Sequence, residues 1–464
     1  MGTIFNKGNT PLKLKHLALA TLTALLSACS QSEPPKPVAD PAAQAEIDSS
    51  IYFRGDDPTD PYRALYAEFR ERRAADMANP ELPKPLAHYQ ATHFTRNMDW
   101  SDLETVLPFE WGKLDPTKAQ ALKNAVKMRL AFDHPDLKIV QIMVGPGGVM
   151  PAHAGGAPGL YIGVGGTGEV TREGATQTLT PGTTVKLNPY DVRRVTANDG
   201  DTPLKLLWIR WAPGGDQAFI DAGYYLTGSN QHIQPETADM PLDYKFWGTV
   251  YDTKTLAAPS IPVITPSDGS FFSAQQSALQ TARAELGDAR DLYPTTPVFG
   301  HESDKGWLTV EQIKKGGFFF SKDAAKFGKI IDRMAAIARH KAIFRAVRRD
   351  GRWDFNISET SWGPRSTYVE HSHLTPEFYY MMSGPVMYGV DGKTYEAMTG
   401  DIIHNNSYSP HLAQGIVDDL VFDNFGSTWA PRGDRSVFGR PFYIVEPLPI
   451  QPKTARIQQD TKFH

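Results

Sequence analysis

The sequence predicts a mainly β fold: two antiparallel, jelly-roll-like β-barrels with additional helices before each barrel. Two observations support this prediction. Residues 145–213 align without gaps to residues 363–431 at a constant shift of 218 positions, so the chain contains an internal duplication. Each copy consists of short segments rich in Val, Ile, Tyr and Thr, separated by turns such as Asp391-Gly392, which is typical of antiparallel sandwiches and barrels.

The residues shared by the two copies are mostly those that mark turns and large core contacts. The matched pairs include His153 and His371, Pro158 and Pro376, Tyr161 and Tyr379, Gly166 and Gly384, Gly182 and Gly400, Asn188 and Asn406, and Tyr190 and Tyr408. Because the shift never changes between the ends of the match, a duplicated domain explains the agreement better than chance does.

Three helices are expected outside the strands. One covers Tyr62 to Phe69, whose apolar residues share one helical face. A second begins at Asp115-Pro116, a helix cap followed by a first-turn proline, and continues towards Phe132. The third leads into the second copy, from about Lys329 to Gly351. The expected division is a signal peptide (1–28), a tether (29–50), a helical region (51–132), the first barrel (133–216), a connector with short elements (217–328), a helix plus the second barrel (329–450) and a polar tail (451–464).

Composition places the chain among globular proteins and argues against nucleic acid as a partner. With 464 residues and 41% hydrophobic residues it can bury a large core. Its formal net charge is −4, and basic runs such as Arg348-Arg349 lack the interleaved aromatic residues that single-stranded nucleic acid requires.

The N-terminus has the features of an export signal. Lysines precede an apolar run from Leu17 to Leu26, which is too short to span a bilayer. Leu26-Ser27-Ala28-Cys29 resembles the lipobox of bacterial lipoproteins, in which the cysteine carries the lipid, and Cys29 is the only cysteine. We therefore expect a protein anchored through Cys29 in the cell envelope, facing the periplasm and with the outer membrane favoured. The alternative is a secreted protein cut after Ala28.

Residues 371–384, HSHLTPEFYYMMSG, contain the strongest chemical signal. Side chains two apart on a strand share a face, so His371 and His373 point the same way. After the turn that follows, Glu377 would face the same point from the next strand. Two imidazoles and a carboxylate suit a divalent transition metal. The alternative is that both histidines are polar residues on a solvated strand.

These residues resemble the cupin family. His371, His373, Glu377 and Gly384 fit the spacing of its first motif, and Gly400 and His411 fit its second. Asn406 and Tyr408 replace the usual Pro and Gly of the second motif, so we expect a differently shaped turn. The resemblance implies two cupin barrels and a metal held by His371, His373, Glu377 and His411, with Fe(II) favoured and Mn, Ni or Zn as other candidates.

The first copy retains one of the four ligands. His153 corresponds to His371, but Gly155, Gly159 and Arg193 replace His373, Glu377 and His411. A single imidazole beside a guanidinium holds a divalent ion poorly, so the first barrel is expected to serve as a scaffold or as the surface of a homodimer. The alternative is that Arg193 binds an anion in an empty barrel.

Four further residues are expected near the metal. Tyr379 is a candidate acid or base, with packing as the alternative, and His404 is a candidate for catalysis or for orienting a ligand. Arg365 and Met381 share the ligand face and are expected to contact substrate, Arg365 by clamping a carboxylate.

Three functions remain open from sequence. The first is an Fe(II)-type dioxygenase acting on a small organic substrate, as in duplicated cupins that this chain resembles. The second is a non-redox, metal-dependent lyase, isomerase or decarboxylase. The third is a periplasmic binding protein for a small molecule, with a structural metal.

Overall fold

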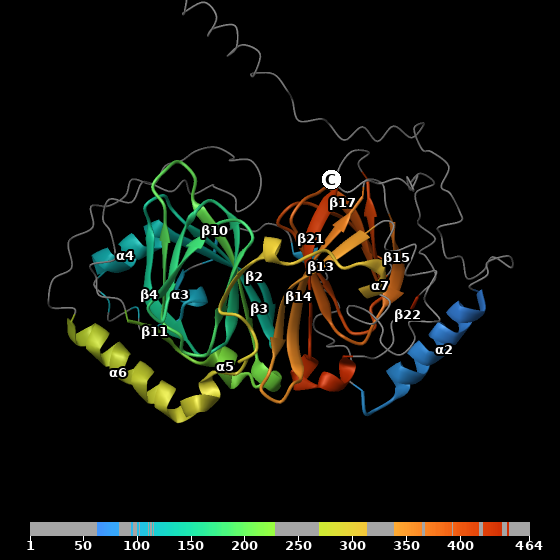
Figure 1. The fold of residues 1–464 in the computed structure, drawn as a ribbon, viewed down its shortest axis with the longest axis horizontal. Helices are drawn as coiled ribbons and strands as arrows, with labels where there is room; N and C mark the ends of the chain where they lie inside the picture. Colours follow the sequence, from blue (N-terminus) through green and yellow to red (C-terminus); the bar gives the residue numbers. More distant parts are fainter. Residues whose placement is uncertain are drawn as a thin grey trace, which may run out of the picture. The chain divides into compact units, whose positions relative to one another are not determined.

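The first barrel consists of two antiparallel sheets that face each other (Figure 1, cyan to green). Its strands are β2 (Val126–His134), β3 (Leu137–Val144), β4 (Val149–Gly155), β5 (Gly159–Gly165), β6 (Gly168–Arg172), β7 (Ala175–Leu179), β8 (Thr183–Leu187), β9 (Arg193–Ala197), β10 (Leu204–Trp211) and β11 (Tyr224–Leu226), with β12 (Phe299–His301) from the connector. The sheet orders are β12-β8-β5-β10-β3-β2 and β11-β4-β9-β6-β7.

The second barrel repeats this arrangement (Figure 1, orange to red). Its strands are β13 (Ala338–Val347), β14 (Trp353–Trp362), β15 (Thr367–Ser372), β16 (Glu377–Met381), β17 (Val386–Val390), β18 (Lys393–Ala397), β19 (Ile402–Asn405), β20 (His411–Gly415), β21 (Phe422–Trp429) and β22 (Tyr443–Ile444), with β1 (Phe94–Thr95) from the N-terminal region. The sheet orders are β1-β19-β16-β21-β14-β13 and β18-β17-β20-β15-β22.

The prediction of a mainly β fold with two antiparallel barrels is confirmed. This computed structural model describes residues 63–82, 94–95, 100–101, 103–109, 111, 114, 116–227, 269–312, 338–363, 367–391, 393–416, 421–438 and 443–444. Strands β6, β7, β9 and β10 coincide with β17, β18, β20 and β21 at the shift seen in the sequence. The signal peptide, the tether, Cys29, Arg365 and the polar tail lie outside the described residues.

Two of the expected helices are wrong in extent or type. The helix α4 (Pro116–Ala125) ends at Ala125, and the residues up to His134 form strand β2. Of the expected helix before the second barrel, residues 329–337 lie outside the described part of the chain, and Ala338–Val347 form strand β13. In both cases the apolar spacing fits a helix, but pairing with β3 and β14 satisfies the backbone and decides the structure. The expected first helix is present as α2 (Arg63–Ala78).

Each barrel has its own apolar interior, and a third apolar cluster lies between the outer faces of the two six-stranded sheets. In this third cluster Trp211 of the first barrel stacks on Phe355 of the second, with ring centroids 4.7 Å apart and planes inclined by 8°. Two reciprocal hydrogen bonds flank it. The amide of Arg432 donates to Asp136 at 3.0 Å, and the amide of Gly214 donates to Asp354 at 3.2 Å.

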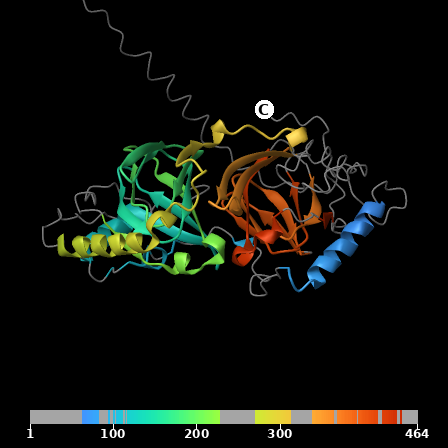
Figure 2. The ribbon, with the colours of Figure 1, turned by 60° about the horizontal axis from the view of Figure 1, so that its bottom comes forward.

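The segments that precede the two barrels are exchanged between them. Strand β1 pairs with β19, placing Phe94 opposite Ile403, and β12 pairs with β8, placing Phe299 opposite the corresponding Val185. Helix α2 lies beside the second barrel, where Phe69 enters its core, and α6 (Gly269–Leu286) lies beside the first, as both views show (Figures 1 and 2). We call the segment with α2 and β1 the N-terminal arm. The connector carries its counterpart, with α6 and β12.

Within the described residues, no helix combines the length and apolar character needed to cross a membrane.

Candidate metal centre

Three histidines of the five-stranded sheet in the second barrel converge at its inner face. His371 lies on β15 and His373 follows that strand directly, while His411 opens the neighbouring strand β20. His371 and His411 are direct cross-strand partners, and their ring centroids are 4.0 Å apart. The rings of His373 and His411 are 5.1 Å apart. The register of β15 against β20 shifts between Tyr368 and His371, and pairing resumes at His371 with His411.

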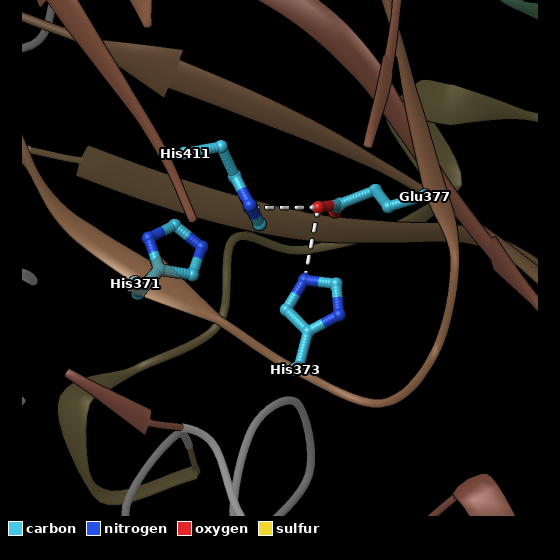
Figure 3. Close-up of side chains that lie close together, drawn as sticks. All are labelled: His371, His373, Glu377 and His411. Atoms are coloured by element: carbon cyan, nitrogen blue, oxygen red, sulfur yellow. Dashed lines mark hydrogen bonds and ion pairs between the residues drawn. The ribbon is translucent and has the colours of Figure 1, made fainter. Parts of the chain in front are cut away.

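Glu377 completes the cluster from the opposite, six-stranded sheet. It is the first residue of β16, and its Oε2 lies 3.1 Å from Nε2 of His373 and 3.2 Å from Nε2 of His411. Figure 3 shows the four side chains directed towards one point. One potential ligand atom from each residue lies within 4.8 Å of all the others. The spacing predicted from sequence therefore corresponds to a real convergence in space.

The imidazoles are held in the orientation that metal ligands adopt. Nδ1 of His373 lies 2.6 Å from the carbonyl oxygen of Thr375, and Nδ1 of His411 lies 2.8 Å from that of Ser409. These contacts fix the orientation of both rings and turn Nε2 towards the cluster.

Burial and mutual contact set the protonation of the cluster. Burial would raise the pKa of Glu377, but its contacts with His373 and His411 hold that pKa below its usual range. Burial lowers the pKa of His411, with His373 adding to the effect and Glu377 opposing it. An ionised carboxylate beside a neutral imidazole is the state that a metal requires of its ligands.

These residues fit a divalent transition metal. Three imidazole nitrogens and one carboxylate oxygen are donors that Fe, Mn, Ni and Zn accept. His371 and His411 are each only 1% exposed, whereas the side chain of His373 is 15% exposed, so the cluster is largely buried and can be reached from the side of His373. Four protein ligands would leave two positions on an octahedral ion for other molecules.

In the first barrel, aromatic rings fill the corresponding space. A Cβ atom at Gly159, the counterpart of Glu377, would lie 2.8 Å from Nε1 of Trp208. A Cβ atom at Gly155, the counterpart of His373, would lie 2.6 Å from Cε1 of Tyr224. Trp208 itself corresponds to Gly426 of the second barrel. The loss of ligands and the gain of bulky rings are therefore complementary changes.

Two buried guanidinium groups contact this aromatic filling. Arg193 and Arg210 lie over the Trp208 ring, with Cζ atoms 5.1 Å and 4.5 Å from its centroid. His153 turns its Nδ1 to the carbonyl oxygen of Pro151 and faces the hydroxyl of Tyr161 at 3.5 Å. Side chains thus occupy the space that the metal ligands take in the second barrel, whereas anion binding by Arg193 stays a prediction.

Tyr379 and Met381 face the interior of the second barrel, as expected. The Tyr379 ring centroid lies 6.3 Å from that of His411, and Met381 is fully buried in the same apolar cluster. His404 does not belong to the centre, which corrects the expectation of a catalytic role. It pairs with Phe378 on the outer face of the sheet, and its ring stacks on Trp429 with centroids 6.0 Å apart. Its contacts therefore belong to the cluster between the barrels.

Two residues near the centre were missed from sequence. Asn405 pairs with Glu377, and its Nδ2 lies 3.5 Å from Glu377 Oε2 and 3.1 Å from the hydroxyl of Tyr388. His340 projects inward from β13, with Nδ1 3.1 Å from the hydroxyl of Thr360. Burial lowers the pKa of His340 to about 3, and Glu377 opposes this shift, so the ring is neutral. His340 could have been found from sequence by treating 338–342 as a strand, because alternating side chains would then place Ala338 and His340 on the same face.

No family model and no curated protein matches the chain. Similar solved structures include AerE from Microcystis aeruginosa, with 8% identity, a TM-score of 0.38 and coverage of 68% of this chain and 94% of that one. Protein Ylba from E. coli has 12% identity, a TM-score of 0.36 and coverage of 66% and 83%. Oxalate decarboxylase from Lactobacillus farciminis has 14% identity, a TM-score of 0.39 and coverage of 66% and 81%. At these values no function is transferred to this chain.

Proposed function

We propose that this chain is a metal-dependent enzyme with a single metal centre, in the second barrel, that acts on a small organic substrate. The convergence of His371, His373, Glu377 and His411 within 4.8 Å is the observation that carries the proposal. The packed centre of the first barrel supports a stoichiometry of one ion per chain.

Within this class we favour an Fe(II)-type dioxygenase. A bound ferrous ion with two open positions would supply activation of dioxygen beside a coordinated substrate. Of the two acid–base residues expected from sequence, only Tyr379 faces the centre. The burial of His371 and His411 would limit the access of bulk water to the reacting atoms.

The test combines elemental analysis with dioxygen uptake. Protein purified from the periplasm is analysed for metal, then loaded anaerobically with Fe(II) and mixed with a panel of small acids, phenols and polyols under air. Substrate-dependent dioxygen consumption that disappears in Glu377→Ala supports the dioxygenase. Metal binding without dioxygen consumption for any compound contradicts it.

A non-redox lyase, isomerase or decarboxylase is the second candidate, favoured by the position of Tyr379 on the ligand face. In that reaction the Tyr379 hydroxyl would move the proton. Turnover under strict anaerobiosis with Mn, Ni or Zn, abolished by Tyr379→Phe while metal content is unchanged, would support this candidate over the dioxygenase. If Glu377→Ala stays folded and keeps full ligand affinity, the metal is structural and the third function, a periplasmic binding protein, is favoured.

We also propose that the protein is lipid-anchored through Cys29 in the cell envelope, on the strength of the sequence Leu26-Ser27-Ala28-Cys29. The wild type would partition into detergent with the membrane fraction, whereas Cys29→Ser would not be lipidated. Recovery of unmodified wild-type protein in the soluble periplasmic fraction would contradict the anchor.

A further inference from the structure

The interior of the second barrel carries polar residues at positions where the first barrel carries apolar ones. Strand register gives the correspondence, because His340 pairs with Thr360 as Met128 pairs with Ile142. The five pairs are His340 and Met128, Ser358 and Val140, Thr360 and Ile142, Asn405 and Leu187, and Asn424 and Leu206. All five apolar members belong to the core of the first barrel. We name the five polar members the polar wall.

The polar wall runs along the inner face of the six-stranded sheet and reaches the metal centre. Ser358 pairs with Gly426, which lies against Tyr379, and Thr360 pairs with Asn424. At the other end, Asn405 Nδ2 lies 3.5 Å from Glu377 Oε2. The five residues are 0–4% exposed, so none of them is in contact with bulk solvent.

Several polar atoms of the wall lack a protein partner. Asn424 is completely buried, and neither its Oδ1 nor its Nδ2 has a hydrogen bond within the described part of the chain. The same is true of Oδ1 of Asn405. Buried amides are almost always hydrogen-bonded, and leaving one unsatisfied destabilises the fold. In the first barrel leucine occupies both corresponding positions, as Leu187 and Leu206, within an apolar core.

The wall selects for an uncharged ligand. Amides, hydroxyls and a neutral imidazole each donate and accept hydrogen bonds, and hydroxyl groups on a ligand complement all three. None of the five wall residues carries a positive charge at neutral pH, so the wall itself offers a ligand hydrogen bonds and no ion pair.

We infer that the polar wall is a substrate-binding surface for a neutral, oxygen-rich compound such as a polyol or hydroxycarbonyl, with Asn424 as a specificity-determining residue. The inference rests on the proposed function for the identity of the neighbouring metal centre. The hydrogen-bonding argument for Asn424 is independent of that centre.

The test exchanges residues between the barrels. Asn424→Leu takes the residue of the first barrel, and Leu206→Asn is the matched reverse change. Tm, metal content and Tm shifts with erythritol (neutral) and malonate (charged) are measured for each variant. We expect Asn424→Leu to raise the Tm by roughly 2–4 °C, to keep its metal and to bind erythritol at least tenfold more weakly. Leu206→Asn should lower the Tm and keep the erythritol response. Thr360→Ile is a second wall variant with the same expectation as Asn424→Leu.

A lower Tm in both wall variants would show that these groups have structural partners and would overturn the inference. An unchanged erythritol response in both, or preference of the wild type for malonate, would overturn the assigned ligand class. The two proposals can fail separately. If the proposed function is wrong but the wall is a binding surface, the purified protein contains no metal, and its Tm shift with erythritol still depends on Asn424. If the metal-loaded wild type shows no Tm shift with erythritol, the inference about the polar wall is wrong, and the proposed metal centre is unaffected.

Discussion

Arg73 of the N-terminal arm donates a hydrogen bond from Nη2 to the carbonyl oxygen of Tyr408, in the second barrel, at 2.7 Å. Arg283 of α6 makes the same contact with Tyr190, the counterpart of Tyr408, also at 2.7 Å. Both tyrosines have positive φ angles, of 65° and 60°. The two exchanged arms are therefore held by equivalent bonds.

Replacing Arg73 by Ala should loosen α2 from the second barrel. A hydrogen bond from a charged donor contributes about 1.5–3 kcal/mol, and this one is only partly buried, so we expect a loss of about 1.5 kcal/mol in the free energy of unfolding. Hydrogen exchange should increase in α2 and at the β22 edge. Met77→Ala, which truncates a side chain that is 40% exposed on the same helix, is the control and should change little. Equal effects of both changes would contradict the role of Arg73.

The duplication supplies a paired test of the metal centre. His371→Ala should lower metal affinity by at least about 100-fold, because it removes one of four ligands. His153→Ala, at the corresponding position of the first barrel, should leave metal content unchanged. Both affinities are measured by competition with a chelator of known strength. A loss of metal in His153→Ala would mean that the first barrel also contributes an ion.

The packed centre of the first barrel should reject even a methyl group at Gly159. The added Cβ would meet Trp208 Nε1 at 2.8 Å and the Ile209 carbonyl at 3.0 Å. We expect Gly159→Ala to destabilise the protein by about 1–3 kcal/mol in chemical denaturation. Gly306→Ala, whose Cβ would meet nothing within 4 Å, is the control and should be neutral. A neutral Gly159→Ala would show that Trp208 moves freely.

Arg432 has a φ of 51°, a left-handed conformation that arginine adopts at a cost, whereas the corresponding Gly214 has a φ of 62° without such a cost. Arg432→Gly should therefore stabilise the protein by about 0.5–1 kcal/mol. It keeps the amide that binds Asp136.

Asp136→Ala, which removes the acceptor of that amide, should destabilise the protein by about 1–3 kcal/mol, while Asp136→Asn should retain most of the stability. Urea denaturation distinguishes these outcomes.

Glu359 should make stability depend on pH. Burial raises its pKa from 4.5 to about 7, with Glu302 adding to the shift and Lys341, 2.8 Å away, opposing it. Because the folded state binds this proton more tightly, the stabilisation is complete below pH 4.5 and is lost as the pH rises to about 7. Glu359→Gln should therefore lose less stability than wild type between about pH 5 and about pH 8. An identical pH profile for both proteins would contradict this assignment.

The four candidate ligands could be predicted because they depend on local rules. Alternation along β15 and a tight turn to β16 bring His371, His373 and Glu377 together, and the spacing after Gly400 brings His411 beside them. His404 was misplaced because sequence does not reveal which face of a strand points inward. The pairing of Asn405 with Glu377 decides it, and this pairing turns His404 to the outer face.

The features that could not be predicted depend on contacts between distant segments. Trp208 and Tyr224 enter the space left by Gly159 and Gly155, and no local pattern links those positions. The helical spacing before the second barrel concealed β13, and His340 with it. The exchange of arms depends on pairings such as Phe94 with Ile403, which sequence periodicity does not encode.

The exchanged arms also set an order of events during synthesis. The segment that carries α2 and β1 leaves the ribosome before either barrel, yet its binding site is made of strands translated last. Until β19 and β22 exist, Phe69 has no pocket to enter. This segment is therefore among the last to dock, and a chain that ends before β19 and β22 would leave it without its binding site.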